Sequence, residues 1–297
     1  MRDVAAIAPG TVDDALAAAS RVLRGVEDAA VEARALLVAV LDVRPSWIAL
    51  HRGEQLAPGV TDRLLDAARR RARGAPLQYA TGRAAFRHLV LSVDERVLIP
   101  RPETELLVDL ALGGLPAGGV AVDVGTGSGC IALALASEGR FERVIATDVS
   151  SDALAVARSN AAALAATLAC PLELREGSLL APLRGTRARL VVSNPPYIAA
   201  GEAESLPRSV RDWEPALALY SGSTGMAHIQ RLATDAAAVL EPGGRLALEV
   251  DARRASLAAE LVASDGRYEG VEVRLDLTGR ERFVLARRRA GVAGSDA

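Results

Sequence analysis

Apolar side chains recur every three to four residues through the N-terminal quarter of the chain, which is the spacing of amphipathic helices. Thr11, followed three residues later by Asp14, suits the cap of a first helix. A second helix is expected over residues 27–41, and another is expected to begin at Thr61 and to end before Gly74. This pattern predicts a small helical domain.

Between residues 76 and 100 the spacing changes to that of strands, with apolar and polar side chains in near alternation. The polar run 94–96 suits a turn, so we predict a β-hairpin that links the helical domain to the rest of the chain. Pro100 and Pro102 then interrupt the pattern, and a helix is expected over 103–112.

From Val120 onward, short apolar runs alternate with helical segments. Such alternation predicts an α/β fold with a doubly wound parallel sheet. A turn is expected at Gly243-Gly244, just before one of the strands. The connection between the last two strands is short and contains a glycine, so the final strand is expected to be antiparallel. The expected strands cover residues 120–124, 143–149, 172–177, 189–197 (a strand that runs into a turn), 245–250, 268–275 and 281–287.

The composition narrows the class of protein. Half of the 297 residues are hydrophobic but only 3% are aromatic, so the core must be built mainly from Ala, Val and Leu. The formal net charge of −2 argues against a protein that binds nucleic acid mainly through phosphates. All 35 basic residues are arginine, so neither a P-loop lysine nor a Schiff-base lysine is available.

Metal, disulfide and membrane classes are also disfavoured. Two cysteines without a CxxC motif and three widely separated histidines suit neither a disulfide framework nor a zinc site. The first ten residues lack the apolar segment of a signal peptide, and no uncharged run reaches the ~18 residues of a membrane helix. We therefore expect a soluble, cytoplasmic protein without a metal.

A glycine-rich turn follows the strand 120–124 and precedes a helix, which is where open α/β sheets bind ligands. Its glycines and the helix N-terminus let the backbone approach a ligand closely. Asp148 ends the next strand, where an acid accepts hydrogen bonds from ribose hydroxyls. An ordinary tight turn, with Asp148 as a helix cap, is the alternative interpretation; we favour a site for an adenosine-containing cofactor. The turn is Asp123-Val124-Gly125-Thr126-Gly127-Ser128-Gly129.

The tetrapeptide Asn194-Pro195-Pro196-Tyr197 stands at the end of the fourth of these strands. An amide or exocyclic amine nitrogen is a poor nucleophile because its lone pair is delocalised. The Asn194 side-chain oxygen and the Pro195 carbonyl can hold both N–H groups of such a nitrogen and aim its lone pair at an electrophilic carbon. The prolines restrict this backbone, and Tyr197 offers an aromatic face to a planar substrate. A plain Asn-Pro turn with a packed tyrosine is the alternative interpretation.

Together these motifs resemble class I S-adenosylmethionine-dependent methyltransferases that act on a planar nitrogen. Further segments resemble the HemK/PrmC family, the N(5)-glutamine methyltransferases of peptide chain release factors, and the resemblance covers nearly the whole chain. These segments are PLQYATG (76–82), VLIPRPETE (97–105), WEPALAL (213–219), GSTGM (222–226) and LTGRERFV (277–284).

The resemblance implies a Rossmann-like, seven-stranded methyltransferase domain over residues 85–290. It implies a helical substrate-recognition domain, with the start of the hairpin, over 1–84 and a flexible tail over 291–297. The implied cofactor is S-adenosyl-L-methionine, with S-adenosyl-L-homocysteine as product. The implied substrate is the glutamine in the Gly-Gly-Gln loop of class-1 release factors, methylated by a monomer with no membrane partner and no direct nucleic-acid substrate.

Site roles carry over from the family by position. The implied cofactor residues are Gly125, Thr126, Gly127, Ser128, Gly129, Asp148, Leu179 and Asn194, and the implied catalytic residues are Asn194, Pro195, Pro196 and Tyr197. Thr104 and Glu105 are expected near the cofactor. Two positions depart from the family pattern: uncharged Ser178 replaces the usual Asp, which is expected to weaken adenine binding, and Asp251 stands where a glycine is usual.

Three other functions compete with this interpretation. An adenine-N6 methyltransferase acting on DNA or RNA is the main alternative, since the tetrapeptide equally suits the exocyclic amine of a flipped base. Such enzymes usually need a basic channel or a target-recognition domain, which a net charge of −2 and a helical N-terminal unit do not supply. A non-catalytic cofactor-binding module has no need of the intact tetrapeptide, and the glycine spacing disfavours an NAD-dependent oxidoreductase.

Overall fold

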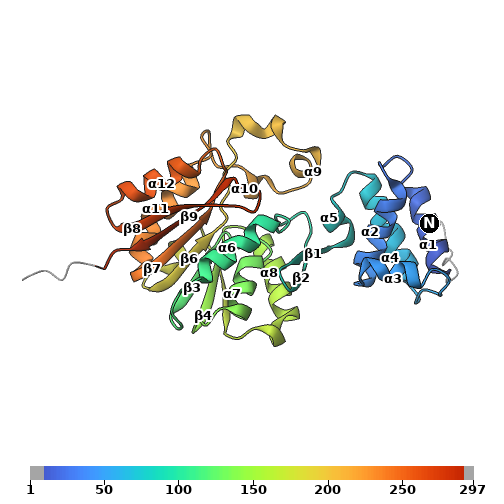
Figure 1. Cartoon of the computed structure of the whole chain (residues 1–297), viewed down its shortest axis with the longest axis horizontal. Helices are drawn as coiled ribbons and strands as arrows, with labels where there is room; N and C mark the ends of the chain where they lie inside the picture. Colours follow the sequence, from blue (N-terminus) through green and yellow to red (C-terminus); the bar gives the residue numbers. More distant parts are fainter. Residues whose placement is uncertain (1–9, 291–297) are drawn as a thin grey trace, which may run out of the picture. The chain divides into compact units, whose positions relative to one another are not determined.

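The computed structural model of the chain describes residues 10–290, which form two compact units (Figure 1). The helical unit comprises the described residues up to Arg83 and the separate segment Arg208–Trp213. The sheet unit comprises Ala84–Pro207 and the chain from Glu214 onward. The sequence places 208–213 with the sheet, whereas in the structure this segment groups with the helices. The tail expected over 291–297 lies outside the described residues.

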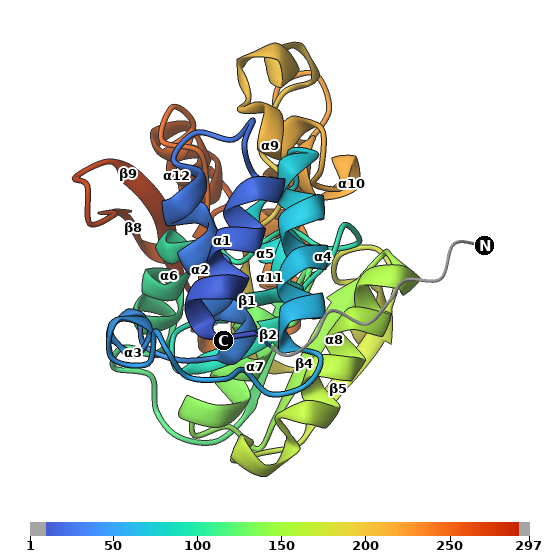
Figure 2. The same cartoon turned by 90° about the vertical axis from the view of Figure 1, so that its right-hand side faces the viewer.

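The helical unit packs amphipathic helices around a core of leucine, alanine and valine, with α1, α2 and α4 in mutual contact (Figure 2). The predicted cap of the first helix is confirmed, because Thr11 Oγ1 accepts from the Asp14 N–H at 3.2 Å while the Asp14 carboxylate accepts from the Thr11 N–H at 3.0 Å. The predicted cap at Thr61 is wrong. α4 begins after Gly59, whose left-handed φ of 79° turns the chain into the helix. The helices are α1 (Val12–Val22), α2 (Ala29–Leu41), α3 (Pro45–Leu50), α4 (Val60–Ala72), α5 (Leu77–Thr81) and α9 (Arg208–Arg211).

A hairpin is present where the sequence predicts one, but the turn between its strands is at Arg87-His88. The predicted turn at 94–96 is also present, closed by a hydrogen bond from the Val97 N–H to the Asp94 carbonyl at 3.1 Å, but it follows the second strand. Arg87 has a φ of 55°, which is uncommon for a residue with a side chain. Its backbone N–H donates to Glu105 Oε1 at 2.9 Å and its guanidinium donates to Glu138 at 2.7 Å. Contacts with residues distant in sequence therefore hold a turn that the local sequence does not signal. The hairpin strands are β1 (Arg83–Phe86) and β2 (Leu89–Ser92).

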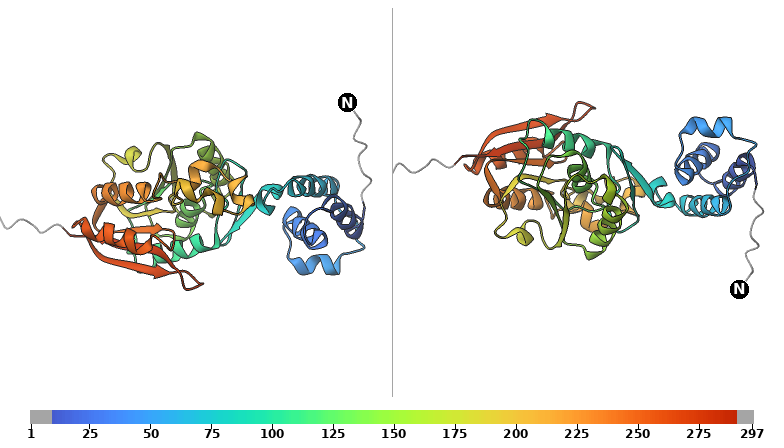
Figure 3. Two further views of the ribbon diagram at one scale, coloured as in Figure 1. Left: turned by 90° about the horizontal axis from the view of Figure 1, so that it is seen from above. Right: turned by 90° about the horizontal axis from the view of Figure 1, so that it is seen from below.

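The predicted seven-stranded sheet is confirmed, with strand order β5-β4-β3-β6-β7-β9-β8. β9 runs antiparallel to β7 and β8, as predicted, and the other neighbouring pairs are parallel; β8 and β9 form one edge of the sheet (Figure 3). The chain passes from β3 outward to β5 and then returns to β6 on the other side of β3. This reversal places the carboxyl ends of β3 and β6 side by side, which is where such sheets bind ligands. The strands are β3 (Val120–Val124), β4 (Arg143–Asp148), β5 (Leu172–Glu176), β6 (Ala188–Ser193), β7 (Leu240–Glu249), β8 (Tyr268–Leu275) and β9 (Glu281–Arg288).

The predicted turn at Gly243-Gly244 is wrong, because both glycines lie within β7. They accompany an irregularity in the pairing of β6 with β7, between Ala188 and Leu190. A Cβ atom at Gly244 would lie 3.0 Å from the Ala188 carbonyl oxygen, so the close approach of the two backbones requires glycine there.

Helices cover both faces of the sheet, as a doubly wound fold requires (Figure 1). α11 and α12 pack on one face, and α6, α7 and α8 pack on the other. The helices are α6 (Pro102–Leu112), α7 (Cys130–Glu138), α8 (Ser151–Ala163), α10 (Ala216–Leu219), α11 (Ala227–Val239) and α12 (Ala255–Ser264), with short 3₁₀ helices at Ala165–Thr167, Ala181–Leu183 and Ala200–Ser205.

Candidate functional site

A cavity of about 350 Å³ opens where the strand order reverses, a volume within the range of small-molecule sites. Residues from the ends of β3, β4 and β6 line it, together with apolar side chains from the segments 97–98 and 215–218. The predicted site residues that line it are Gly125, Gly127, Asp148, Leu179, Asn194 and Pro196. Thr126, Ser128, Gly129, Pro195 and Tyr197 are not among its lining residues.

The glycine turn leaves bare backbone at the cavity wall. Gly125 and Gly127 both have positive φ, and a Cβ atom at either would meet no other atom within 4 Å. Beneath the turn, the buried Asp123 carboxylate accepts hydrogen bonds from Thr126 Oγ1 at 2.6 Å and from the Ala132 N–H at 3.1 Å. Burial raises the pKa of Asp123 to about 7. Thr126 therefore supports the turn from below.

Asp148 lies at the carboxyl end of β4 and faces the same cavity. Its Oδ2 accepts from the Gly127 N–H and its Oδ1 accepts from the Ser150 N–H, both at 2.9 Å. The cap of α8 is Ser150, whose hydroxyl accepts from the Ala153 N–H, so Asp148 is not the helix cap. Each carboxylate oxygen can accept a further hydrogen bond, which fits the hydroxyls of a ribose.

Leu179 adopts a strained backbone beside the cavity, with a φ of 49°. Its carbonyl accepts from Thr147 Oγ1 at 2.9 Å, and its side chain packs against the core between the sheet and α11. Ser178, which replaces an acid of the family pattern, also lines the cavity. Together with Ala153 and Val149, Leu179 gives this end of the cavity an apolar wall that fits a planar ring.

Asn194 connects the cavity to a buried polar group. Its Nδ2 donates to Thr104 Oγ1 at 3.1 Å, and Thr104 Oγ1 donates to Glu249 Oε2 at 2.8 Å. Asn194 lines the cavity, and among residues 10–290 its only side-chain hydrogen bond is the one that Nδ2 donates, which leaves Oδ1 free to accept. Thr104 thus contacts Asn194, one of the predicted site residues, whereas Glu105 accepts from the Arg87 N–H at the hairpin.

Gly225 packs directly behind the tetrapeptide. A Cβ atom there would overlap the Tyr197 carbonyl oxygen and lie 2.7 Å from Nε of Arg254, and its φ is 76°, so only glycine fits. Tyr197 packs against the sheet core, and burial, followed by the negative charge of Glu249, raises its pKa to about 12. The core therefore holds the tetrapeptide in one conformation.

The sequence interpretation assigns no role to Glu249 or to His228. Glu249 ends β7, the strand beside β6, and an acid at the carboxyl end of an otherwise apolar strand is the signal that could have identified it. His228 lines the cavity and its Nδ1 lies 2.7 Å from Ser221 Oγ. Nothing in the spacing of the three histidines places His228 there.

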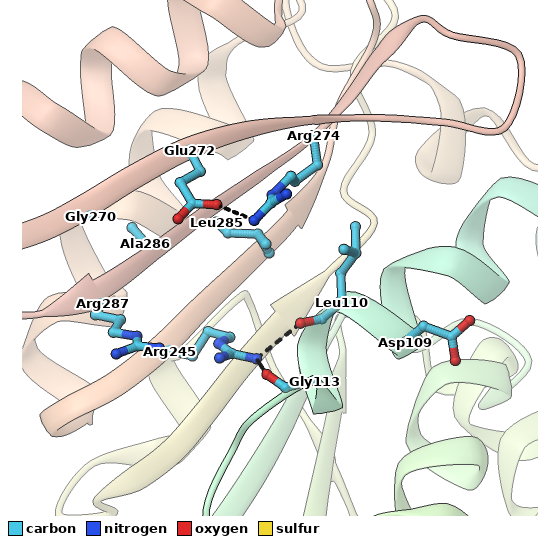
Figure 4. A pocket seen from close by; sticks show the side chains of 10 residues that line it. All are labelled: Asp109, Leu110, Gly113, Arg245, Gly270, Glu272, Arg274, Leu285, Ala286 and Arg287. Carbon is cyan, nitrogen blue, oxygen red and sulfur yellow. Dashed lines mark hydrogen bonds and ion pairs between the residues drawn. The ribbon is translucent and has the colours of Figure 1, made fainter.

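A second hollow, of about 360 Å³, is lined by residues of α6 and of the strands β7, β8 and β9 (Figure 4). It contains none of the predicted site residues. Its most buried charged side chain, Arg245, donates through Nη1 to the carbonyls of Leu110, Ala111 and Gly113 at 2.7–2.9 Å. Arg245 therefore caps the C-terminus of α6, which is a structural role.

Metal binding, membrane insertion and thiol chemistry find no support in the residues that the structure describes. Residues 10–290 contain no group of His, Cys, Asp and Glu side chains that could hold a metal ion. None of the helices formed by these residues is long and apolar enough to cross a membrane. Cys130 begins α7, but burial raises the pKa of its thiol to about 12, which disfavours a reactive thiolate.

Comparisons with known proteins identify the family and the fold. The PrmC N-terminal domain family matches residues 14–82, and the methyltransferase small domain family matches residues 103–208. A release factor glutamine methyltransferase of Deinococcus radiodurans is 44% identical, over 90% of this chain and 94% of the relative. One from Moorella thermoacetica is 42% identical, over 89% of this chain and 93% of the relative. The crystal structure of a methyltransferase from Pyrococcus furiosus shares the fold at 20% identity, with a TM-score of 0.52 over 69% of this chain and 91% of that one.

Proposed function

The chain belongs to the PrmC family of release factor glutamine methyltransferases, and on this premise we propose that it methylates the side-chain amide nitrogen of a release-factor glutamine. The glutamine is that of the Gly-Gly-Gln loop, and the methyl donor is S-adenosyl-L-methionine. The observation that carries the proposal is the free acceptor Asn194 Oδ1 at a cavity walled by the glycine turn and Asp148. This site suits a primary amide brought to an adenosine-containing donor.

The donor fits the residues present. Gly125 and Gly127 give open backbone, Asp148 gives carboxylate oxygens for the ribose, and Leu179 gives an apolar wall for the adenine. When bound, S-adenosyl-L-methionine supplies a methyl group on a sulfonium sulfur, which the amide nitrogen takes to leave S-adenosyl-L-homocysteine. The residues assigned to the donor are Gly125, Thr126, Gly127, Ser128, Gly129, Asp148, Leu179 and Asn194, with Thr126 and Ser128 acting through the shape of the turn.

Asn194, Pro195, Pro196 and Tyr197 are assigned to the substrate glutamine. Asn194 Oδ1 and the Pro195 carbonyl accept the two N–H groups of the amide, which holds its lone pair toward the donor. Developing positive charge on the nitrogen strengthens both hydrogen bonds. No side chain is needed as a tuned base, because the methylated amide nitrogen is acidic enough to lose its proton to water. Catalysis here depends on orientation more than on proton transfer.

The helical unit is assigned to recognition of the release factor, since the family model for its residues is specific to this family. We expect the enzyme to act as a monomer, in the cytoplasm where release factors work, on protein rather than on nucleic acid. The net charge of −2 supports a protein substrate, because a nucleic-acid methyltransferase gains much of its affinity from phosphate contacts.

The direct test is mass spectrometry of a release factor incubated with the protein and S-adenosyl-L-methionine. The peptide that contains Gly-Gly-Gln is expected to gain the mass of one methyl group in place of hydrogen, on the glutamine. Asn194→Ala should lower the rate by at least about 100-fold. The Kd for the donor, measured by calorimetry, should stay within about threefold, because the glycine turn and Asp148, which hold most of the donor, remain. Gln230→Ala, which removes an exposed amide on α11, is the matched control and should retain full activity. Methyl transfer to DNA or RNA oligonucleotides, with none to the release factor, would contradict the proposal.

A further inference from the structure

Three residues from distant parts of the chain form one hydrogen-bonded row at the site. Thr104, in the first turn of α6, stands between Asn194 after β6 and Glu249 at the end of β7. Thr104 and Glu249 are 2% and 1% exposed, so the row is shielded from water on the side away from the cavity. The row ends at the one side chain that is assigned to hold the substrate amide.

The direction of the row follows from what each group can donate. An ionised carboxylate only accepts, so the single hydroxyl proton of Thr104 goes to Glu249. Thr104 Oγ1 can then only accept, and only the NH₂ end of the Asn194 amide can donate to it. The oxygen end of that amide must therefore point away from Thr104.

From this geometry, and resting on the proposed function, we propose that Glu249 and Thr104 are positioning residues for methyl transfer. The carboxylate, acting through the Thr104 hydroxyl, holds Asn194 with Oδ1 presented to the substrate amide. An amide side chain turned over by half a rotation would present its NH₂ group to the substrate NH₂ group, and the substrate would lose an acceptor. Glu249 thus selects the orientation of Asn194 without contacting substrate or cofactor.

The surroundings of Glu249 support a functional role for its charge. Burying a carboxylate is costly unless it is paired, and no arginine among residues 10–290 forms an ion pair with Glu249. Arg101 pairs with Glu214 at 2.5 Å and Arg282 lies 3.7 Å from Asp276, so both act on Glu249 only from a distance. A site that served packing alone would be filled better by an apolar side chain. Glu249 is buried, has no ion-pair partner among the described residues and lies one hydrogen-bonded residue away from Asn194. We therefore attribute its presence to the orientation of the Asn194 amide.

Protonation of Glu249 would allow the Asn194 amide to adopt either orientation. Burial raises the pKa of Glu249 to about 7. A protonated carboxyl group can donate to Thr104, which can then donate to Asn194 and accept the turned-over amide. The ionised fraction of Glu249 grows as pH rises through about 7, so the reaction should accelerate over that range. The titratable and charged groups that act on Glu249, or on which it acts, are Arg101, Glu103, Cys130, Tyr197 and Arg282.

The first experiment compares Thr104→Val, Thr104→Ser and Glu249→Gln in the full-length enzyme. Thr104→Val keeps the shape but loses the hydroxyl, and should lower kcat by about 100-fold with the Kd for the donor within about threefold of the wild type. Thr104→Ser restores the hydroxyl and should recover kcat to within several-fold. Glu249→Gln should lower kcat and abolish the rise of kcat with pH around 7. Thr167→Val, which removes an exposed hydroxyl bonded to the Leu164 carbonyl at 2.8 Å away from the cavity, is the matched control and should behave as the wild type.

The second experiment needs no substrate. In ¹⁵N NMR spectra of the protein, the side-chain NH₂ signal of Asn194, assigned by its loss in Asn194→Ala, should shift with pH with a midpoint near 7. In Glu249→Gln this titration should disappear. The proposal would be overturned if the Asn194 shift in the wild type did not change with pH, or if Glu249→Gln kept the same midpoint. A Thr104→Val enzyme that is folded and fully active would also overturn it. If the wild type does not methylate a release factor, the proposed function fails, and the NMR titration still decides whether Glu249 controls Asn194.

Discussion

Asp148 shows how one side chain serves both the fold and the site. Its two carboxylate oxygens each accept one backbone N–H, from Gly127 and Ser150, and so tie the glycine turn to the start of α8. The same oxygens face the cavity. The sequence predicts the ribose role from position alone, but the tie to Gly127 depends on how β3 and β4 pair, which no local pattern reveals.

The change Asp148→Asn should weaken donor binding. The variant keeps one acceptor oxygen but loses the charge and the second acceptor, and a hydrogen bond to a charged group contributes about 1.5–3 kcal/mol. The Kd for S-adenosyl-L-methionine, measured by calorimetry, should therefore rise about 10–100-fold. Asp235→Asn, on α11 and outside the cavity lining, is the control and should bind normally. Equal affinity in both variants would remove Asp148 from the ribose site.

At the scale of elements, the sequence predicted pieces that depend on local spacing and failed where distant contacts decide. The bounds of β3 match the prediction of 120–124, because a buried apolar run ends there at a glycine turn. The hairpin turn was misplaced because Arg87 takes a left-handed backbone that Glu105 and Glu138 hold. The prediction of a turn at Gly243-Gly244 failed for a similar reason. Gly244 is needed where β7 comes close to the Ala188 carbonyl of β6, a contact that the local sequence does not reveal.

The end of α6 offers a test of such a distant contact. Arg245→Met should lower the free energy of unfolding by about 1–3 kcal/mol, because it leaves three carbonyls at the helix terminus without their donor. Urea unfolding would measure the change. Arg287 is exposed and pairs with Arg245 from the neighbouring strand β9, so Arg287→Met is the matched control. Its free energy of unfolding should stay within about 0.5 kcal/mol of the wild type. An equal loss in both variants would mean that surface charge, rather than the cap, is responsible.

At the scale of the whole molecule, the division of the chain into two units is only partly visible in the sequence. The helical unit was predicted from periodicity, but its membership is not continuous along the chain, since Arg208–Trp213 joins it from the middle of the sheet unit. Trp213 packs against the core of the helical unit. The spacing of apolar residues describes one segment at a time. It therefore cannot predict that a short segment far along the chain packs against the core of the helical unit.

The global stability should depend on pH through the buried Asp123. Burial raises its pKa from 3.8 to about 7, so the folded state binds this proton more tightly than the unfolded chain does. The contribution of Asp123 to stability is therefore greatest below pH 3.8 and is lost as pH rises through about 7. Asp123→Asn, which cannot ionise, should gain about 2–3 kcal/mol relative to the wild type between pH 5 and pH 8. Urea unfolding at both pH values checks this, and a constant difference would show that Asp123 titrates normally.

The sequence by itself determined the chemistry that the chain can offer: the glycine turn, Asp148, the acceptor Asn194 and the alternation that makes a doubly wound sheet. Each of these features depends on residues close together in the chain, so the spacing of apolar residues and the local motifs are enough to predict it. Only the tertiary structure decided which groups surround Asn194. Thr104 and Glu249 lie 145 residues apart in the chain, and they meet because α6 packs against the face of the sheet beside β7. Their hydrogen bonds form only when the sheet, the helix and the tetrapeptide are all in place.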